Sequence, residues 1–164
     1  MGRAGLVGDE VGSALIGARL VRDVMRLGFL MERTYAPYPK WFGTAFARLR
    51  CAPALLPHLQ AALAARTWQE RERHLVPAYE TVAAMHNALG LTELLPDTAR
   101  GFFGRPFRVI ALHGFSRALL ACIHDERVCR IAVRPPIGSI DQFSDSTDLL
   151  SNASWREGLR GLYR

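Results

Sequence analysis

We predict an all-α fold for this sequence, as one domain over residues 1–164 with a bundle of about six to seven helices. Apolar side chains recur at steps of three and four residues along most of the chain, as they do on one face of a helix. Prolines and glycines divide the chain into segments of helical length. No pair of alternating apolar segments surrounds a tight turn, so the sequence gives no signal for a strand pair.

The first long helix is predicted over Gly8–Arg33, where apolar positions form one stripe. The stripe consists of Val11, Leu15, Ala18, Val21, Met25 and Leu30. Gly12, Gly17 and Gly28 each cost the helix up to about 1 kcal/mol relative to alanine, so we expect packing to hold it together. Tyr35–Pro39 ends the pattern, because each proline forces the residue before it out of the helical region.

Three more helices are predicted between this break and Gly90. One covers about Lys40–Leu49, and the next begins at Pro53, since proline suits the first turn of a helix. Thr67–Glu70 has the spacing of a capping box, in which the two side chains bond each other's free amides, and it starts a helix that ends at Gly90. Pro77 lies inside that helix, where we expect a kink or a break.

The second half of the chain is predicted to begin with a loop over Asp97–Phe107, which is rich in glycine and proline. Asp125 is a suitable cap for the second of three further helices. These helices are expected over Val109–Ile123, Asp125–Val133 and Trp155–Tyr163. Pro135–Gly138 separates the last of them from the others, and we expect residues 134–164 to form a packed C-terminal tail.

Composition is typical of a soluble protein, with 49% hydrophobic and 22% charged residues. Asp9 and Glu10 interrupt the region where a signal peptide would need an apolar core, and no stretch is long enough to span a membrane. The three cysteines form an odd, scattered set that suits a reducing compartment. We therefore expect a cytoplasmic protein that does not bind membranes.

The net charge of +6 arises from arginine, because 20 of the 21 basic residues are arginines and Lys40 is the single lysine. A positive surface attracts phosphate and nucleic acid. So extreme a preference for arginine, however, is typical of coding bias in a GC-rich bacterial genome. We therefore do not expect nucleic acid as a partner, and Lys40 is the one cation that the bias does not explain.

The strongest candidate site begins on the predicted first helix, which presents a basic face. This face carries Arg19, Arg22, Arg26 and Arg33. Guanidinium groups in register suit a polyphosphate, a carboxylate ligand or an acidic partner, because each makes bidentate charge-assisted bonds. The alternative is a solvated face in which Asp23 and Glu32 are the internal partners of the arginines.

A second candidate follows directly, as a rigid segment that carries Tyr35, Tyr38, Lys40 and Trp41. Aromatic rings beside a lysine can stack a flat molecule and offer it a point charge. The alternative is a buried aromatic corner that fixes a connection between two helices.

In the tail, Asp141, Asp145 and Asp148 are spaced to share one side of a helix, where neighbouring carboxylates raise each other's pKa. An aspartate-rich helix start is the alternative interpretation. We expect no metal there, because hard cations need more oxygen ligands than this run supplies.

Weaker candidates lie elsewhere in the chain. Cys122, His124 and Cys129 lack the paired spacing of a zinc site. Arg108 and His113 resemble the arginine-histidine motif of helical ribonuclease domains of the HEPN type. His86 and Asn87 are expected to be a polar pair near the end of their helix, with their hydrogen bonds satisfied within the fold.

A set of longer motifs resembles the family called domain of unknown function 4037. The motifs are GDEVGS at 8–13, ARLVRDVMRL at 18–27, FLMER at 29–33, YAPY at 35–38, KW at 40–41, GTAF at 43–46, AYE at 78–80, HNALG at 86–90, RPFR at 105–108, IDQF at 140–143 and DSTD at 145–148. They extend over nearly the whole chain. In this family the domain usually follows a nucleotidyltransferase palm, so the resemblance implies a helical substrate domain.

We do not expect a palm within this chain. A palm needs Gly-Ser and then two nearby aspartates that hold a metal, whereas Gly12 and Ser13 are followed by Asp23 and Met25. The chain is also similar, more loosely, to the helical C-terminal domains of aminoglycoside nucleotidyltransferases. The resemblance to the domain of unknown function 4037 implies one shared pocket, lined by Arg22, Asp23, Arg26, Tyr35, Tyr38, Lys40, Trp41, Asp141, Gln142, Asp145 and Asp148.

These observations lead to a stand-alone module that binds a small polar or anionic molecule, or that docks a separate palm protein. The alternative is a small enzyme of specialised metabolism, in which Asp145 or Asp148 is the general base and Lys40 or Arg22 stabilises negative charge. A minor alternative is an RNA-acting domain that uses Arg108 and His113. No cofactor is expected, and the sequence leaves association with a second copy open.

Overall fold

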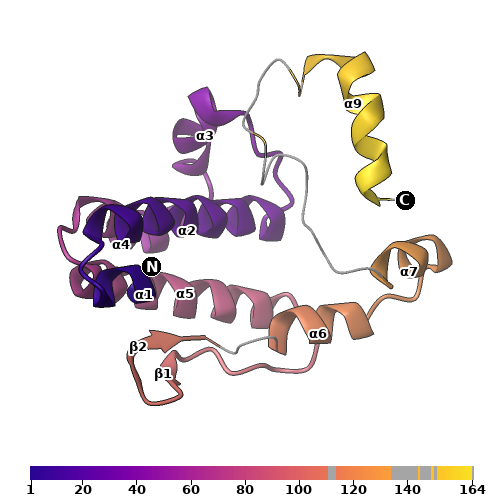
Figure 1. Ribbon diagram of the computed structural model, residues 1–164. Coiled ribbons are helices and arrows are strands. Elements are labelled where there is room, and N and C mark those ends of the chain that lie inside the picture. The colour runs from indigo at the N-terminus through magenta and orange to yellow at the C-terminus, as the bar shows by residue number, and fades with distance from the viewer. Residues whose placement is uncertain (111–113, 134–143, 145–148, 150, 164) are drawn as a thin grey trace.

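The computed structural model describes residues 1–110, 114–133, 144, 149 and 151–163. Within them, eight α-helices, one short 3₁₀ helix and a two-stranded hairpin follow one another along the chain (Figure 1). The elements are α1 (Gly2–Leu6), α2 (Glu10–Met31), α3 (Pro39–Phe46), α4 (Ala52–Ala64), α5 (Trp68–Ala88), β1 (Arg100–Phe102), β2 (Arg105–Val109), α6 (Gly114–Ala121), α7 (Glu126–Ala132), α9 (Ala153–Leu159) and η2 (Arg160–Tyr163). The predicted helical class is confirmed.

The core lies where α2, α4 and α5 pack against one another, with α1 across one end (Figure 1). Phe29 and Phe46 meet in this core with their ring centroids 5.9 Å apart. Leu55, Leu59 and Leu75 are buried beside them. Burial of side chains of this size stabilises the fold by roughly 1.5–3 kcal/mol each, so these residues hold the three long helices together.

The predicted apolar stripe of α2 is wrong in most of its members. Val11, Leu15 and Leu30 are 75%, 69% and 73% exposed, although Val21 is buried as expected. The buried face of α2 instead consists of Ser13, Gly17, Val21, Val24, Gly28 and Phe29. Because these residues face the core in place of most of the predicted stripe, α2 is rotated about its axis relative to the prediction. The two glycines on this face leave room for neighbours that approach closely.

Gly17 shows how close that approach is. A Cβ atom at this position would lie 2.3 Å from Cδ of Arg71, which comes from α5. At Gly28, a Cβ atom would lie 3.0 Å from the ring of Phe46. The glycines therefore contribute to packing and are more than a cost to the helix.

Several predicted helix ends are confirmed. The Thr67–Glu70 capping box is formed with both of its bonds, and Asp125 accepts from the first amides of α7. Helix α5 continues through Pro77 as one element, and the hydroxyl of Thr81 donates to the Pro77 carbonyl at 2.9 Å. None of the helices in the described part of the chain is long and apolar enough to cross a lipid bilayer.

The predicted loop over residues 97–107 is wrong, because this region contains the antiparallel hairpin β1–β2. Strand β2 also includes Val109, which was expected to begin a helix, and α6 is described over Gly114–Ala121. Strand β1 has only three residues, too few for an alternation of apolar and polar side chains to be recognised. The predicted packing of the tail over residues 134–164 stays a prediction, since much of that segment lies outside the described residues.

Candidate functional site

The N-terminal half of α2 is fixed to α5 through a buried arginine. Arg71 is 3% exposed, and its guanidinium donates to Oγ of Ser13 at 2.8 Å and to the carbonyl of Ala65 at 3.0 Å. A carboxylate oxygen of Glu10 lies 3.6 Å from the same guanidinium. The other Glu10 oxygen accepts from the amide of Trp68 at 3.1 Å. A buried charge with this many partners holds α2 in one position relative to α5.

The C-terminal end of α2 is fixed to the start of α4 by Glu32. Its carboxylate accepts from the amide of Cys51 at 2.8 Å and from the amide of Arg50 at 3.0 Å. Burial raises the pKa of Glu32, but these hydrogen bonds outweigh burial and lower the pKa to about 2. Glu32 was one candidate for an internal partner of the basic face. Its carboxylate bonds the backbone and side chain of Arg50 and the backbone of Cys51.

The same contact affects Cys51. Burial, together with the hydrogen bond and the negative charge of Glu32, raises the pKa of the Cys51 thiol to about 12. The thiol is therefore neutral and a poor nucleophile. Cys122 and Cys129 are exposed.

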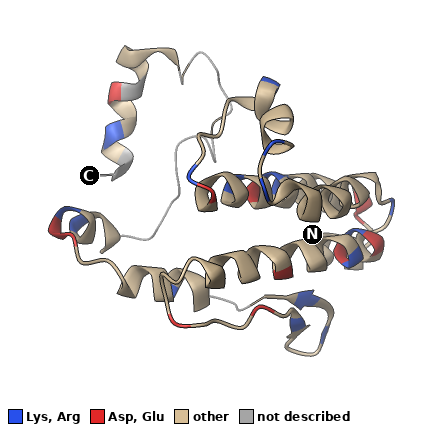
Figure 2. Ribbon diagram, turned by 180° about the vertical axis from the view of Figure 1, so that it is seen from behind, with Lys and Arg blue, Asp and Glu red and all other residues tan. Residues whose placement is uncertain are grey.

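Between these two anchors, α2 carries the predicted basic face. Arg19 is exposed, whereas Arg22 and Arg26 are half-buried, and neither of these two is without a partner. The guanidinium of Arg26 lies 6.0 Å from the ring centroid of Phe42, so this face reaches α3. Basic residues are visible along α2 in Figure 2.

The aromatic segment lies on the surface. Tyr35 is 87% exposed and Trp41 is 50% exposed, so the alternative of a buried aromatic corner is wrong for these two side chains. Nζ of Lys40 lies 5.3 Å from the ring centroid of Trp41, within cation–π range. Tyr38, the residue before α3, is 42% exposed. These side chains are available to a ligand or partner but are not enclosed.

Asp23 faces a different environment, a cavity of about 290 Å³ between α2, α5 and α6. The walls are mainly apolar and include Leu20, Leu27, Met31, Val82, Phe115 and Leu119. Tyr79 and His86 join Asp23 as the polar members of the lining. Burial raises the pKa of Tyr79 well above its usual range, and the carboxylates of Glu72 and Asp23 raise it further. The Tyr79 hydroxyl is therefore a neutral hydrogen-bond donor in the cavity wall.

His86 and Asn87 form the satisfied polar pair that the sequence predicts. Nε2 of His86 lies 3.0 Å from Oγ1 of Thr92, and the ring of Phe115 meets the imidazole edge to face at 4.8 Å. The Asn87 amide donates to the carbonyl of Leu95 at 2.8 Å and accepts from its amide at 3.1 Å. Both residues tie the loop after α5 back to the helix, which leaves them a structural role.

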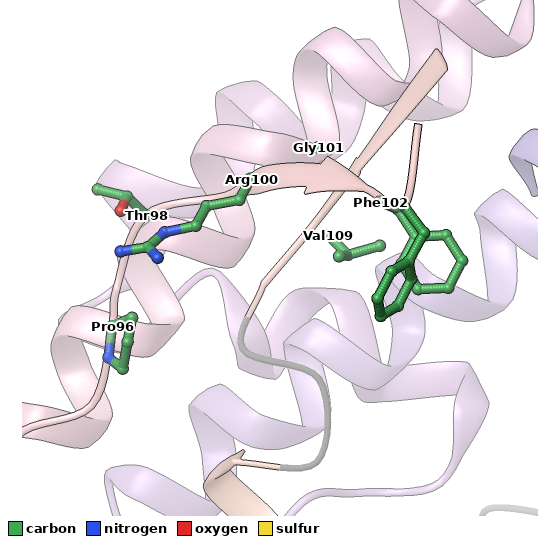
Figure 3. A pocket seen from close by; sticks show the side chains of 7 residues that line it. Pro96, Thr98, Arg100, Gly101, Phe102 and Val109 are labelled. Atoms are coloured by element: carbon green, nitrogen blue, oxygen red, sulfur yellow. The ribbon is translucent and has the colours of Figure 1, made fainter. Parts of the chain in front are cut away.

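A second hollow lies at the hairpin, with a volume of about 220 Å³ (Figure 3). Arg100 and Thr98 lie at one end of it and Phe102 at the other, with Val109 between them. The sequence prediction missed this hollow, because it treated the segment as an irregular loop. The signal that could have indicated it is Phe103 followed by glycine, which is a candidate two-residue hairpin turn between aromatic and basic residues.

Arg108 is occupied within the fold. It lies in strand β2, and its guanidinium donates to the carbonyl of Ala99 at 2.7 Å. His113 lies outside the described residues, as do Asp141, Gln142, Asp145 and Asp148. Within the described ranges, no three histidine, cysteine or acidic residues are grouped so that they could hold a metal ion.

One comparison with known proteins gives a match. The model of the family described as Domain of unknown function (DUF4037) matches residues 1–42, a segment that contains α1, α2 and the first residues of α3. The resemblance is thus confirmed over residues 1–42, and for the later motifs it stays a prediction. No curated protein and no solved structure matches the chain.

Proposed function

We propose that this chain is a helical binding module whose ligand or partner is recognised by α2. The observation that carries the proposal is the position of Asp23 in the 290 Å³ cavity, on the same helix turns as Arg22 and Arg26. A concave apolar space with a few converging polar groups is the usual form of a small-molecule site. The family match over residues 1–42 covers this helix, which adds support.

The ligand that suits this arrangement is a small polar or anionic molecule with an apolar part. The apolar part enters the cavity, whose lining includes Asp23 but none of the three arginines, and the anionic part is bound outside it by the guanidinium groups of Arg19, Arg22 and Arg26. Lys40 and Trp41 extend this surface toward α3 with a point charge and a flat ring. Asp141 and Gln142 complete the proposed site, on the strength of the resemblance alone.

The anchors of α2 favour such a role. The contacts of Arg71 at one end and Glu32 at the other hold the helix rigidly. A recognition surface held in one conformation loses less entropy when it binds. The second form of the proposal, docking of a nucleotidyltransferase palm from another chain, uses the same surface of α2.

Binding is tested by thermal unfolding in the presence of inorganic pyrophosphate and of citrate, as probes for phosphate and carboxylate ligands. Arg22→Ala combined with Lys40→Ala is expected to remove the stabilisation that these anions give to the wild-type protein. Arg48→Ala is the matched control, because Arg48 is exposed and lies outside α2, in the connection between α3 and α4. If the double variant keeps both ligand stabilisation and partner association, the α2 surface is not the site.

The enzyme alternative makes a different prediction for Asp145 and Asp148. In a binding module, replacing both with asparagine leaves stabilisation by ligand in place. In an enzyme, the same change abolishes turnover with little loss of binding. The two functions are therefore separable with one pair of substitutions.

A further inference from the structure

The tip of the β1–β2 hairpin carries an unusual residue. Phe103 and Gly104 form the two-residue turn, with φ values of 45° and 72°. Such a turn favours asparagine, aspartate or glycine, because a bulky side chain is strained at positive φ. Phe103 is nevertheless there, and its ring is 87% exposed. The strained backbone at Phe103 is not offset by burial of its ring, which points to a functional reason for this residue.

The hairpin is held firmly on the helical bundle. The amide of Arg108 donates to the carboxylate of Glu72 at 2.8 Å, and the amide of Ala99 donates to the carboxylate of Glu80 at 2.9 Å. Both carboxylates come from α5. On the other side, a Cβ atom at Gly2 would lie 3.0 Å from the ring of Phe107, so the hairpin also rests on α1. The hairpin is a fixed platform for its tip.

Aromatic and basic side chains alternate on this platform. The ring of Phe102 stacks on Phe107 with 5.6 Å between centroids and meets Phe103 edge to face at 5.0 Å. The guanidinium of Arg105 lies 5.4 Å from the centroid of the Phe102 ring. Arg100 is exposed at the far end of the hollow, beside Thr98 (Figure 3).

We infer that this hollow binds a planar aromatic ring that carries a phosphate, which is the chemistry of a nucleotide. The ring stacks on Phe103 and lies over Val109, and the phosphate is bound by the guanidinium of Arg100 and the hydroxyl of Thr98. Arg105, on the opposite strand, adds positive charge near the stacked ring. Aromatic platforms beside arginines bind bases without hydrogen-bond readout, because every base has a π face.

The same chemistry has two sources, a free nucleotide and single-stranded nucleic acid. The expectation against nucleic acid rests on composition, whereas this inference rests on where the hairpin places its residues. It is also independent of the α2 surface. Failure of either proposal therefore leaves the other unchanged.

The test uses the full chain and two probes. One is AMP, measured by calorimetry, and the other is a fluorescein-labelled thymidine oligonucleotide of about 12 nucleotides, measured by anisotropy. Phe103→Asn is the decisive variant, because asparagine suits positive φ but offers no ring to stack on. Its melting temperature is expected to equal or exceed that of the wild type, while its affinity falls by about 5- to 150-fold.

Arg100→Ala supplies the electrostatic arm of the test. It is expected to weaken binding and to lower the slope of log affinity against log salt by about 1. Arg48→Ala removes the same charge at an exposed position on a different part of the fold, and it is expected to have a smaller effect. Ribose 5-phosphate, which lacks a base, is expected to compete poorly with AMP.

Binding of AMP alone supports the proposal with a free nucleotide as the ligand, and binding of the oligonucleotide alone supports it with single-stranded nucleic acid. Binding of both supports the shared chemistry. The proposal is overturned if neither probe binds, which is also the result expected of a hairpin that docks a protein. It is equally overturned if Phe103→Asn binds as the wild type does, or if Arg48→Ala is as harmful as Arg100→Ala. Competition by ribose 5-phosphate as strong as that by AMP would exclude stacking.

Discussion

Replacing Gly17 with alanine tests whether the glycine face of α2 is a packing surface. In the wild-type protein a Cβ atom would lie 2.3 Å from Cδ of Arg71, well inside van der Waals contact. Arg71 cannot simply move away, because its guanidinium is held by Ser13 at 2.8 Å and by Ala65 at 3.0 Å. The new methyl group therefore forces either the backbone of α2 or the whole arginine to shift.

The magnitude follows from three effects. Alanine improves helix propensity by about 1 kcal/mol. Overpacking costs about 1–3 kcal/mol, and loss of a hydrogen bond to a charged group costs about 1.5–3 kcal/mol. We expect Gly17→Ala to lower the free energy of unfolding by about 1.5–5 kcal/mol in total, measured by urea unfolding with circular dichroism.

Gly43→Ala is the control for propensity. Gly43 is an exposed residue within α3, and a Cβ atom there would have nothing within 4 Å. This variant is expected to gain up to about 1 kcal/mol. In an Arg71→Ala background, Gly17→Ala is also expected to stabilise, because the clashing atoms are gone. A Gly17→Ala protein as stable as the wild type would refute the reasoning.

Three further predictions concern single contacts. The pKa of Glu32 is lowered to about 2 in the folded protein, so its contribution to stability is complete above about pH 5 and is lost as the pH falls toward 2. Urea unfolding of Glu32→Gln should show a loss of about 1–2 kcal/mol at neutral pH and a weaker fall in stability between about pH 5 and pH 2 than in the wild type. The same fall in both proteins would contradict this prediction. Iodoacetamide at pH 8 should label Cys122 and Cys129 before Cys51, whose pKa is about 12, and equal labelling of all three in peptide mass spectra would be inconsistent with a neutral thiol. Asn87→Ala removes both hydrogen bonds to the loop after α5 and should cost about 1–3 kcal/mol in thermal unfolding, whereas no change would mean that water replaces them.

Local signals predicted the helices well. The capping box at Thr67, the cap at Asp125 and the prolines in the first turns of α3 and α4 each act within a few residues, so they can be identified without the tertiary structure. The rotation of α2 could not be predicted in this way. Its buried face is decided by Arg71 and Phe46, which are distant in sequence and approach only because glycine leaves room for them.

For the candidate site, too, the sequence predicted some features and not others. Residue types and spacing made Arg26 and Lys40 candidates, whereas the family resemblance added Asp23 and implied one shared pocket. Asp23 instead lies in the cavity wall against α5 and α6, and Lys40 lies beside Trp41 on the surface. The hairpin was missed because its turn has Phe103 at the first positive φ, where asparagine, aspartate or glycine is usual, so Phe103–Gly104 is only a weak turn signal.

The acidic side chains explain why the basic charge stays on the surface. Glu10, Glu32, Glu72 and Glu80 each accept a hydrogen bond from a backbone amide of another element, and so they join helices to helices and to the hairpin. Two of them also pair with arginines, Glu10 with Arg71 at 3.6 Å and Glu32 with Arg50 at 3.4 Å, and the chain keeps its net charge of +6. The resulting positive potential raises the local concentration of anions near the molecule, which favours both proposed sites. The use of these carboxylates within the fold therefore contributes to where the positive charge acts.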